Sequence, residues 1–393
     1  MKIVVLIVLQ FIGVNVFYAQ DDRVQTLLSD FSMDSVVTNV KKLSGELPIT
    51  LNGSPITITS RLYNNIGNEQ TYQYLKSKLI EYGYSIDSLE FSTNGKNLFG
   101  IKKGTVFPNR ICMLGAHYDN LPTGSIAPGV DDNASGTCAV LEAARLMSTK
   151  TFPNTVVFAF WDEEELGLIG STAFANQFNS SKDSLLGYIN LDMIAWDSDN
   201  DMSTHIQVRP VSNSSSLSEL AKSCNTLYNI GLNVTIIDPG SPNTDHYPFW
   251  QNDLTAIGIS EEYQGDFNWY WHTVNDILGN TNLEYFTKNA RLALVSFSTL
   301  AYNKSGNQTT EEIINNAVTY PNPVETMLEI QFQQAVTQKI ELEICNIYGE
   351  VLKSNSFNNI DVIDLDFSNY SSGTYFIHLF ATGNSKIFKI QKI

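Results

Sequence analysis

The chain has 393 residues, of which 43% are hydrophobic and 11% aromatic, so it can form packed cores in more than one domain. Its 41 acidic residues outnumber its 24 lysines and arginines, which gives a formal net charge of -17. A charge of this sign repels phosphate backbones and anionic lipid surfaces, and therefore argues against nucleic acid as a partner.

Residues 1–19 are predicted to be a secretory signal peptide. They contain a lysine, an apolar stretch and Ala19 at a plausible cleavage point, although the bulky Phe17 departs from the small-residue pattern before the cut. The alternative is a membrane anchor, but the apolar stretch is short and the remaining sequence contains no second span. We therefore expect export and no stable membrane span.

Residues 20–302 are predicted to form a layered α/β domain, because strand-like apolar runs alternate with helix-like stretches. The strand candidates are residues 110–119, 155–163, 185–195, 205–210, 233–238 and 255–261. The helix candidates are residues 68–83, 134–149, 216–231 and 282–302. Since the strand candidates are apolar throughout, we expect a sheet that is covered on both faces.

After this domain the composition changes twice. Residues 303–317 are polar and predict a linker. Residues 318–393 show period-two alternation with glycines at turn positions, which predicts a small all-β sandwich.

The four cysteines are far apart in the sequence, which argues against a thiolate metal motif and against a disulfide framework. We expect buried free thiols, with a pair between Cys112 and Cys138 as an open alternative. The other two are Cys224 and Cys345.

Five segments place polar side chains at the ends of predicted strands or in the loops that follow. Ligands bind beyond the carboxyl ends of strands in open α/β sheets, so these segments are predicted to meet at one site. Imidazole and carboxylate groups without thiolates suit catalytic zinc, and their number suits a two-metal hydrolase. The segments are GAHYD with His117 and Asp119, PGVDDNASG with Asp131 and Asp132, WDEEEL with Glu164 and Glu165, NLDMIA with Asp192, and NWYWHTVND with His272 and Asp276.

Most of these segments also have an ordinary explanation. A histidine at a strand end is often a hydrogen-bonded surface residue, and Asp132 or Asn133 could cap a helix. The acids from Asp162 to Glu165 could form a solvated helix start. Asp192 is harder to explain in this way, because a carboxylate inside an apolar strand is costly unless it is paired or coordinated.

The acidic run also raises a question of charge. Neighbouring carboxylates in a partly buried site repel each other, and one of them would normally take up a proton. A metal ion would offset the charge of one glutamate, and the other glutamate could then act as a base towards water.

In this order, the five segments resemble the secreted co-catalytic di-zinc aminopeptidases of the bacterial leucyl aminopeptidase type. The resemblance covers residues 110–276 and implies the zinc exopeptidase fold, which is a mixed, mainly parallel central sheet sandwiched by helices. It also implies two Zn²⁺ ions per chain. The implied substrates are peptides or proteins with a free N-terminus, whose first peptide bond is hydrolysed.

The resemblance implies residue roles position by position. Glu164 matches the general base, and Asp131 matches only a variable neighbour. Asp162 and Glu163 match no catalytic residue and are expected to be solvated or supporting charges. The implied metal ligands are His117 and Asp192 for one zinc, Glu165 and His272 for the other, and Asp132 bridging both. The supporting or pocket positions are Asp119, His246, Tyr247 and Asp276.

The chain departs from the resemblance in two places. Family members often place a tyrosine near the metals to support the oxyanion. Tyr247 and Tyr270 are nearby candidates here, but both could equally be wall residues of the pocket. Trp271 precedes His272, where a tyrosine is commoner, and this could reshape the pocket mouth. His246 is expected either to line or support the pocket or to make a simple hydrogen bond at a helix start.

The C-terminal segment resembles a second family, the sorting domains that direct cargo to the type IX (Por) secretion system. The resemblance rests on YPNPV, NIYGEVL and the ending from SSGTYFIHLF to SKIFKIQKI. It implies the type IX secretion machinery as a partner and a secreted or cell-surface location. The alternative is a small β-module that binds carbohydrate or protein.

Several functions compete with an aminopeptidase. A glutaminyl-peptide cyclase shares the implied fold but uses one zinc, and a carboxypeptidase or dipeptidase of the same wider clan is also possible. From another class, a non-catalytic binding module could keep the fold. The complete ligand set and the intact EELGLIGS favour hydrolysis over cyclisation, and the complete ligand set also argues against a binding module. The carboxypeptidase and dipeptidase alternatives stay open, as does the preferred first residue.

Overall fold

The computed structural model describes residues 20–122, 124–178, 184–303, 314, 317–336, 339–358, 360–381 and 384–393. The predicted signal peptide and most of the predicted linker lie outside these residues. The chain divides into two compact units, Met1–Asn303 and Lys304–Ile393, and each is described by itself.

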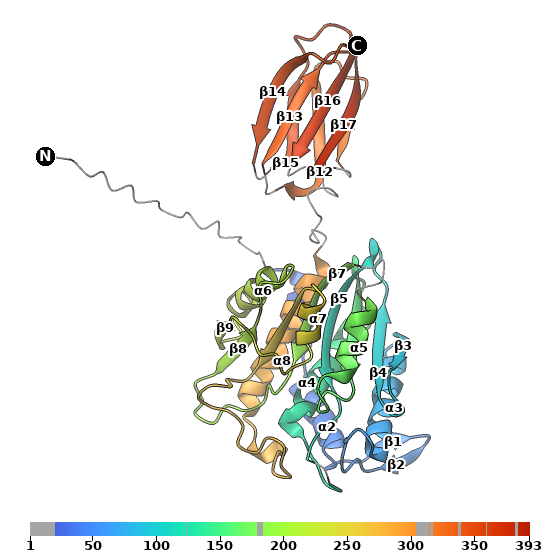
Figure 1. Ribbon diagram of the computed structural model, residues 1–393, viewed down its shortest axis with the longest axis vertical. Coiled ribbons are helices and arrows are strands. Elements are labelled where there is room, and N and C mark those ends of the chain that lie inside the picture. The colour runs from blue at the N-terminus through green and yellow to red at the C-terminus, as the bar shows by residue number, and fades with distance from the viewer. Residues whose placement is uncertain are drawn as a thin grey trace, which may run out of the picture. The chain divides into compact units, whose positions relative to one another are not determined.

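The first unit is built on an eight-stranded sheet with the order β3-β4-β6-β5-β7-β10-β8-β9 (Figure 1). The pairs β6–β5, β5–β7, β7–β10 and β8–β9 are parallel. The pairs β3–β4, β4–β6 and β8–β10 are antiparallel. This confirms the mixed, mainly parallel sheet. The strands are β3 Ser85–Glu90, β4 Lys96–Lys102, β5 Phe107–His117, β6 Asn154–Trp161, β7 Ser184–Leu191, β8 Ser203–Gln207, β9 Asn233–Ile237 and β10 Ala256–Ser260.

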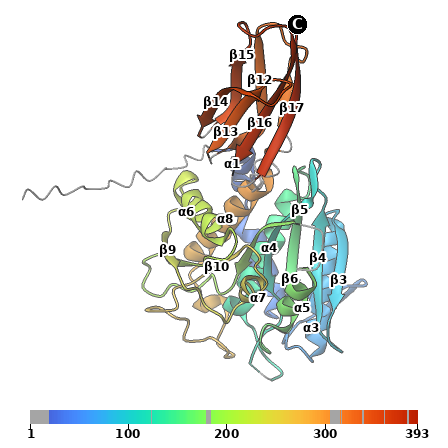
Figure 2. The ribbon, with the colours of Figure 1, turned by 45° about the horizontal axis from the view of Figure 1, so that its top comes forward.

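Helices cover both faces of this sheet, as the apolar strands predict. On one face α3, α4, α6 and α8 pack on the strands, with α6 beside α8 (Figure 2). The shorter α5 and α7 pack on the other face. The helices are α1 Asp22–Ser29, α2 Met33–Leu43, α3 Ile66–Glu81, α4 Gly136–Met147, α5 Ile169–Phe178, α6 Ser214–Leu227, α7 Tyr247–Gln251 and α8 Leu283–Tyr302. Short elements are the hairpin β1 Ile49–Leu51 and β2 Ser54–Ile56, and the single turns η1 Val130–Ser135 and η2 Leu278–Asn280.

Alternate residues of the central strands supply two separate cores. In β6, Phe158 and Phe160 point to the core under α4 and α8, whereas Val157 and Trp161 point to the core under α5 and α7. A strand buried on both faces has no solvent-facing positions, which is why its sequence is apolar without a period of two. The same strands end together at one edge, since His117 is level with Trp161 and Leu191 is level with Ile259.

The second unit is an antiparallel β-sandwich, as the period-two alternation predicts. A three-stranded sheet of order β11-β12-β15 and a four-stranded sheet of order β14-β13-β16-β17 share one apolar core. In β16, buried residues alternate with half-buried ones. The strands are β11 Val318–Tyr320, β12 Met327–Val336, β13 Ile340–Cys345, β14 Val351–Phe357, β15 Ile360–Asp366, β16 Gly373–Ala381 and β17 Asn384–Lys392.

Two further findings concern the described residues. None of their helices combines the length and the apolar character that are needed to span a bilayer. All four cysteines are buried and unpaired, so the open alternative of a Cys112–Cys138 disulfide is wrong.

Gly136 is predicted to be intolerant of a side chain, because it lets α4 approach the end of β7. A Cβ at this position would lie 2.6 Å from the carbonyl oxygen of Leu191 and 2.5 Å from Oδ1 of Asn133. We expect Gly136→Ala to lower the free energy of unfolding of the first unit by about 1–3 kcal/mol through overpacking. Chemical denaturation followed by tryptophan fluorescence measures this unit, since all five tryptophans precede residue 303.

Gly279→Ala is the matched control for this prediction. A Cβ at Gly279 would meet its nearest atom at 3.9 Å, so its effect should stay within about 0.5 kcal/mol. Equal unfolding curves for the two variants would contradict the tight contact between α4 and β7.

Candidate metal centre

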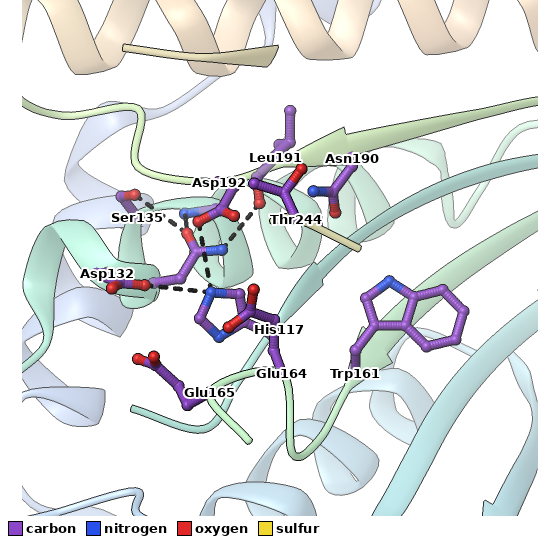
Figure 3. A network of polar contacts seen from close by, with 12 residues as sticks. His117, Asp132, Ser135, Trp161, Glu164, Glu165, Asn190, Leu191, Asp192 and Thr244 are labelled. Atoms are coloured by element: carbon purple, nitrogen blue, oxygen red, sulfur yellow. Dashed lines mark hydrogen bonds and ion pairs between the residues drawn. The ribbon is translucent and has the colours of Figure 1, made fainter. Parts of the chain in front are cut away.

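The five predicted metal ligands lie together at the carboxyl edge of the sheet. His117 ends β5, and its Nε2 lies 3.2 Å from Oδ1 of Asp132 and 3.4 Å from Oδ1 of Asp192. Nε2 of His272 lies 3.1 Å from Oδ2 of Asp132 and 2.8 Å from Oε2 of Glu165. The two oxygens of the Asp132 carboxylate therefore face two different imidazoles. Figure 3 shows the acidic side chains converging around the ring of His117.

These spacings fit the geometry of zinc ligands. Atoms that bind one tetrahedral zinc at about 2.0 Å lie about 3.3 Å apart. Oε1 of Glu165 is buried without a hydrogen-bond partner, and Nε2 of His272 makes no well-directed hydrogen bond although two carboxylate oxygens are close to it. Among the described residues, two groups at this site offer ligand atoms within 4.8 Å of one another: His117 with Glu164 and Asp192, and His117 with Asp132 and Glu165.

Protons compensate the buried charges when no metal is bound. Burial alone would lower the pKa of His117, but the nearby carboxylates of Glu164, Asp119, Asp132 and Asp192 raise it well above its usual value. Burial likewise opposes protonation of His272, yet Asp132 and Glu165 raise its pKa to about 9. Burial and the charge of Asp132 raise the pKa of Glu165 to about 7. The metal-free site therefore holds protons at the positions that cations would neutralise.

Asp119 connects the two sides of the site. Its Oδ1 lies 3.4 Å from Nδ1 of His117. Its two oxygens also accept hydrogen bonds from the backbone N–H groups of Glu164 and Glu165, each at 3.2 Å. Nδ1 of His117 makes no well-directed hydrogen bond, so this carboxylate faces the imidazole and fixes the turn that carries both glutamates.

Glu164 lines the pocket above these residues. Burial raises its pKa well above the usual value, His117 opposes this rise, and the charges of Asp192, Asp245 and Glu165 add to it. Glu164 therefore holds a proton more tightly than an ordinary glutamate does, which suits a group that gains and then releases a proton.

Asp162 and Glu163 are buried, so of the two alternatives, solvated or supporting charges, the solvated one is wrong for both. Asp162 accepts hydrogen bonds from Nδ2 of Asn68 at 2.8 Å and from the hydroxyl of Tyr118 at 2.9 Å. Glu163 accepts one from Oγ of Ser92 at 2.7 Å. The acidic run is therefore a hydrogen-bonded loop, and the helix that follows it begins only at Ile169.

Asp276 and Asp131 support the segment of Asp132. The Asp276 carboxylate accepts hydrogen bonds from the backbone N–H groups of Asp131 at 2.9 Å and of Asp132 at 3.1 Å. Asp131 is fully buried, and its Oδ1 accepts a hydrogen bond from the N–H of Ala195 at 2.8 Å. Asp131, which the sequence analysis treats as a variable neighbour, therefore links the turn Val130–Ser135 that carries Asp132 to the segment after β7.

Sequence reasoning missed Arg61, because its contacts follow no motif. Its guanidinium is fully buried and donates to the carbonyl oxygens of Pro128 and Gly129, each at 2.8 Å. Gly129 directly precedes the turn Val130–Ser135 and has a φ of +51°, in the left-handed region that favours glycine. Arg61 therefore fixes the orientation of the two carbonyl groups that precede the turn of Asp132.

A pocket of about 690 Å³ opens over the site. Its walls include Met193, Tyr247, Phe267 and Trp271. Tyr247 thus lies where the sequence places it, in the pocket wall. His246 does not line this pocket; it is buried against Trp250 with ring centroids 4.4 Å apart, and burial lowers its pKa to about 3.

Two family profiles match the chain. Residues 97–296 match the one described as Peptidase family M28, and this match spans half of the chain. The chain belongs to peptidase family M28. Residues 318–392 match the Secretion system C-terminal sorting domain, which indicates that this M28 protein is secreted or attached to the cell surface.

Relatives of this M28 chain match it over limited segments. The leupeptin-inactivating enzyme 1 of Streptomyces exfoliatus is 35% identical over 141 residues, which are 34% of this chain and 31% of that protein. An aminopeptidase of Pseudomonas aeruginosa is 43% identical over 88 residues, which are 22% of this chain and 16% of that protein. The chain spans less than half the length of the curated relatives it matches.

Solved structures confirm the zinc exopeptidase fold of this M28 chain. The LapA aminopeptidase of Legionella pneumophila has a TM-score of 0.63 at 22% identity, covering 77% of this chain and 80% of that one. A Zn-dependent exopeptidase from Parabacteroides distasonis has a TM-score of 0.53 at 18% identity, covering 70% and 99%. Identities this low establish the fold alone.

Zinc binding to the metal-free protein is predicted to weaken as the pH falls. His272, with a pKa of about 9, and Glu165, with a pKa of about 7, must lose their protons before they can bind a cation. Below each pKa, the apparent zinc affinity should fall about tenfold per pH unit for each proton released. Calorimetric titrations at pH 6 to 8, in buffers of different ionisation enthalpy, count these protons. Binding without proton release at pH 7 would contradict the predicted competition.

Proposed function

We propose that this chain is an exported metalloaminopeptidase that hydrolyses the N-terminal peptide bond of peptides or proteins with two zinc ions per chain. The observation that carries the proposal is the arrangement around Asp132. Its two oxygens lie 3.2 Å from Nε2 of His117 and 3.1 Å from Nε2 of His272. A carboxylate shared in this way favours a pair of cations over a single one.

The proposed ligand sets follow from these contacts. His117 and Asp192 would hold one zinc, Glu165 and His272 the other, and Asp132 both. Zinc ions bound there would polarise the scissile carbonyl group and lower the pKa of a water molecule. The chain contributes the burial of His117, Asp132 and Asp192. It also contributes the hydrogen bonds of Asp119 that fix the backbone of Glu164 and Glu165.

Glu164 is proposed to move the proton. It lines the pocket, and its carboxylate, the imidazole of His117 and the Asp192 carboxylate offer atoms within 4.8 Å of one another. Glu164 would take a proton from the attacking water as the water oxygen bonds to the carbonyl carbon. It would then give that proton to the leaving amine as the C–N bond breaks.

A free N-terminus suits this pocket, which Asp132, Glu164, Glu165 and Asp192 line. A zinc ion held there would keep a coordination position open for the α-amino group of the substrate. Aminopeptidases are found among the M28 relatives and the structural neighbours of this chain, which supports the same choice.

The domain organisation is also proposed. Residues 1–19 would be the signal peptide, residues 20–302 the catalytic domain, residues 303–317 the linker and residues 318–393 the sorting domain. The type IX secretion machinery is the proposed partner of the sorting domain, because residues 318–392 match a secretion sorting profile.

Glu164→Gln is predicted to keep zinc but to lose turnover. The amide cannot accept the proton, so kcat should fall by about 10²–10⁴-fold. Glu163→Gln is the matched control, since Glu163 is buried against Ser92 and does not line the pocket. Release of the first residue from leucine, alanine, lysine and glutamate substrates, together with zinc analysis, measures the effect. A zinc-replete Glu164→Gln protein with parental turnover would contradict the role of Glu164.

Amino-blocked substrates separate the competing functions. An aminopeptidase should ignore peptides with an acetylated N-terminus, whereas a carboxypeptidase should shorten them from the other end. Formation of pyroglutamate from an N-terminal glutamine would indicate a cyclase, and turnover of no peptide by zinc-loaded protein would indicate a binding module.

A further inference from the structure

Asn268 joins three segments around the metal centre. Its Nδ2 donates a hydrogen bond to Oδ2 of Asp131 at 2.8 Å, and its backbone N–H donates to Oε1 of Glu261 at 2.9 Å. Its Oδ1 accepts from the N–H of Tyr270 at 2.8 Å, and its carbonyl oxygen accepts from the N–H of Trp271 at 3.2 Å. Because Asn268 is only 2% exposed, water competes little for these bonds.

Two of these partners are fixed to the sheet. Oδ1 of Asp131 accepts from the N–H of Ala195, which follows β7. Glu261 directly follows β10, and its N–H donates to the carbonyl oxygen of Met193 at 2.7 Å. Asn268 therefore connects the ends of β7 and β10 to the turn that leads to His272.

The position of the His272 side chain has less support from the sheet than that of His117, so the contacts of Asn268 matter more for His272. His117 belongs to a strand and its side chain is 1% exposed, whereas the side chain of His272 is 25% exposed and stacks on Trp271. The backbone of His272 has a φ of +55°, which is uncommon for a residue with a side chain and requires support from its surroundings.

The segment of His272 is attached to Asp131 on both sides. Four residues before His272, Asn268 bonds to the Asp131 side chain. Four residues after His272, the Asp276 carboxylate accepts from the Asp131 backbone N–H. Both attachments therefore reach the residue that directly precedes Asp132.

We propose that Asn268 is a positioning residue, which holds the turn of His272 against Asp131 and so sets the second metal position, formed by Asp132, Glu165 and His272. This inference rests on the proposed function, because its consequence is the binding of the second zinc. Sequence reasoning gave Asn268 no role.

Asn268→Asp tests the proposal because it keeps the size of the side chain but turns the donor towards Asp131 into a second carboxylate. Zinc affinity at the second metal position should fall by about 10- to 100-fold, so that dialysed protein retains close to one zinc per chain. The kcat should fall together with the zinc content. Asn268→Ala, which adds no charge, should change both quantities in the same direction. Asn275→Asp is the control, since Asn275 is exposed on the same loop, and it should retain zinc and activity.

Exchanging the two partners gives a stricter test. The double variant Asn268→Asp with Asp131→Asn again places one amide opposite one carboxylate, so it should recover at least tenfold of the zinc affinity that Asn268→Asp loses. The Tm of the zinc-free Asn268→Asp protein should fall less than the Tm of the zinc-bound protein, so that the rise in Tm caused by zinc shrinks.

Three outcomes would overturn the inference. They are parental zinc retention in Asn268→Asp, no recovery in the double variant, and a fall in the zinc-free Tm as large as the fall in the zinc-bound Tm, which would make Asn268 a fold-stabilising residue. In each case the parent protein would still bind two zinc ions and cleave peptides. A parent protein that binds no zinc would contradict the proposed function instead.

Discussion

The density of carboxylates around Asp132 is the constraint on which the rest of this site depends. Buried carboxylates repel each other, and each needs a hydrogen-bond donor, a proton or a cation. Asp119 and Asp276 are satisfied by backbone N–H groups, and Asp162 by Asn68 and Tyr118. The carboxylates that face the two imidazoles have no comparable set of donors, which is why protons or metal ions have to neutralise them.

The sheet explains why these groups can be brought together at all. Because β5, β6, β7 and β10 run parallel and end nearly level with one another, the loops after them start side by side at the same edge of the sheet. Loops at the carboxyl ends of parallel strands are free to carry polar groups, while the strands themselves are held by the two apolar cores. The fold thus supplies rigidity, and the loops supply the charged chemistry.

The positions of most helices and strands and of the proposed metal ligands could be predicted from the sequence, because they follow from local sequence patterns. His117 ends an apolar strand and Asp192 directly follows one, so their places at one edge follow from the order of the strands. The six strand candidates and four helix candidates are found within a few residues of their expected positions. The sequence analysis does not predict β3 and β4. β3 is largely exposed at the sheet edge and carries mixed polar residues, and β4 has only a short apolar run between lysines.

The supporting contacts could not be predicted, because they join residues that are far apart in sequence and often involve backbone atoms. Arg61 binds carbonyl groups, which any residue supplies, and Asn268 bonds to Asp131 across 137 positions. The burial of Asp162 and Glu163 likewise depends on Asn68 and Ser92. Residue types reveal possible ligands, but tertiary structure decides which neighbours hold them.

Anomalous X-ray diffraction at the zinc edge, from crystals of the zinc-loaded protein, tests the central claim most directly. The account predicts two peaks on opposite sides of the Asp132 carboxylate, one next to His117 and Asp192 and the other next to Glu165 and His272. A single peak, or two peaks that do not share Asp132, would contradict it.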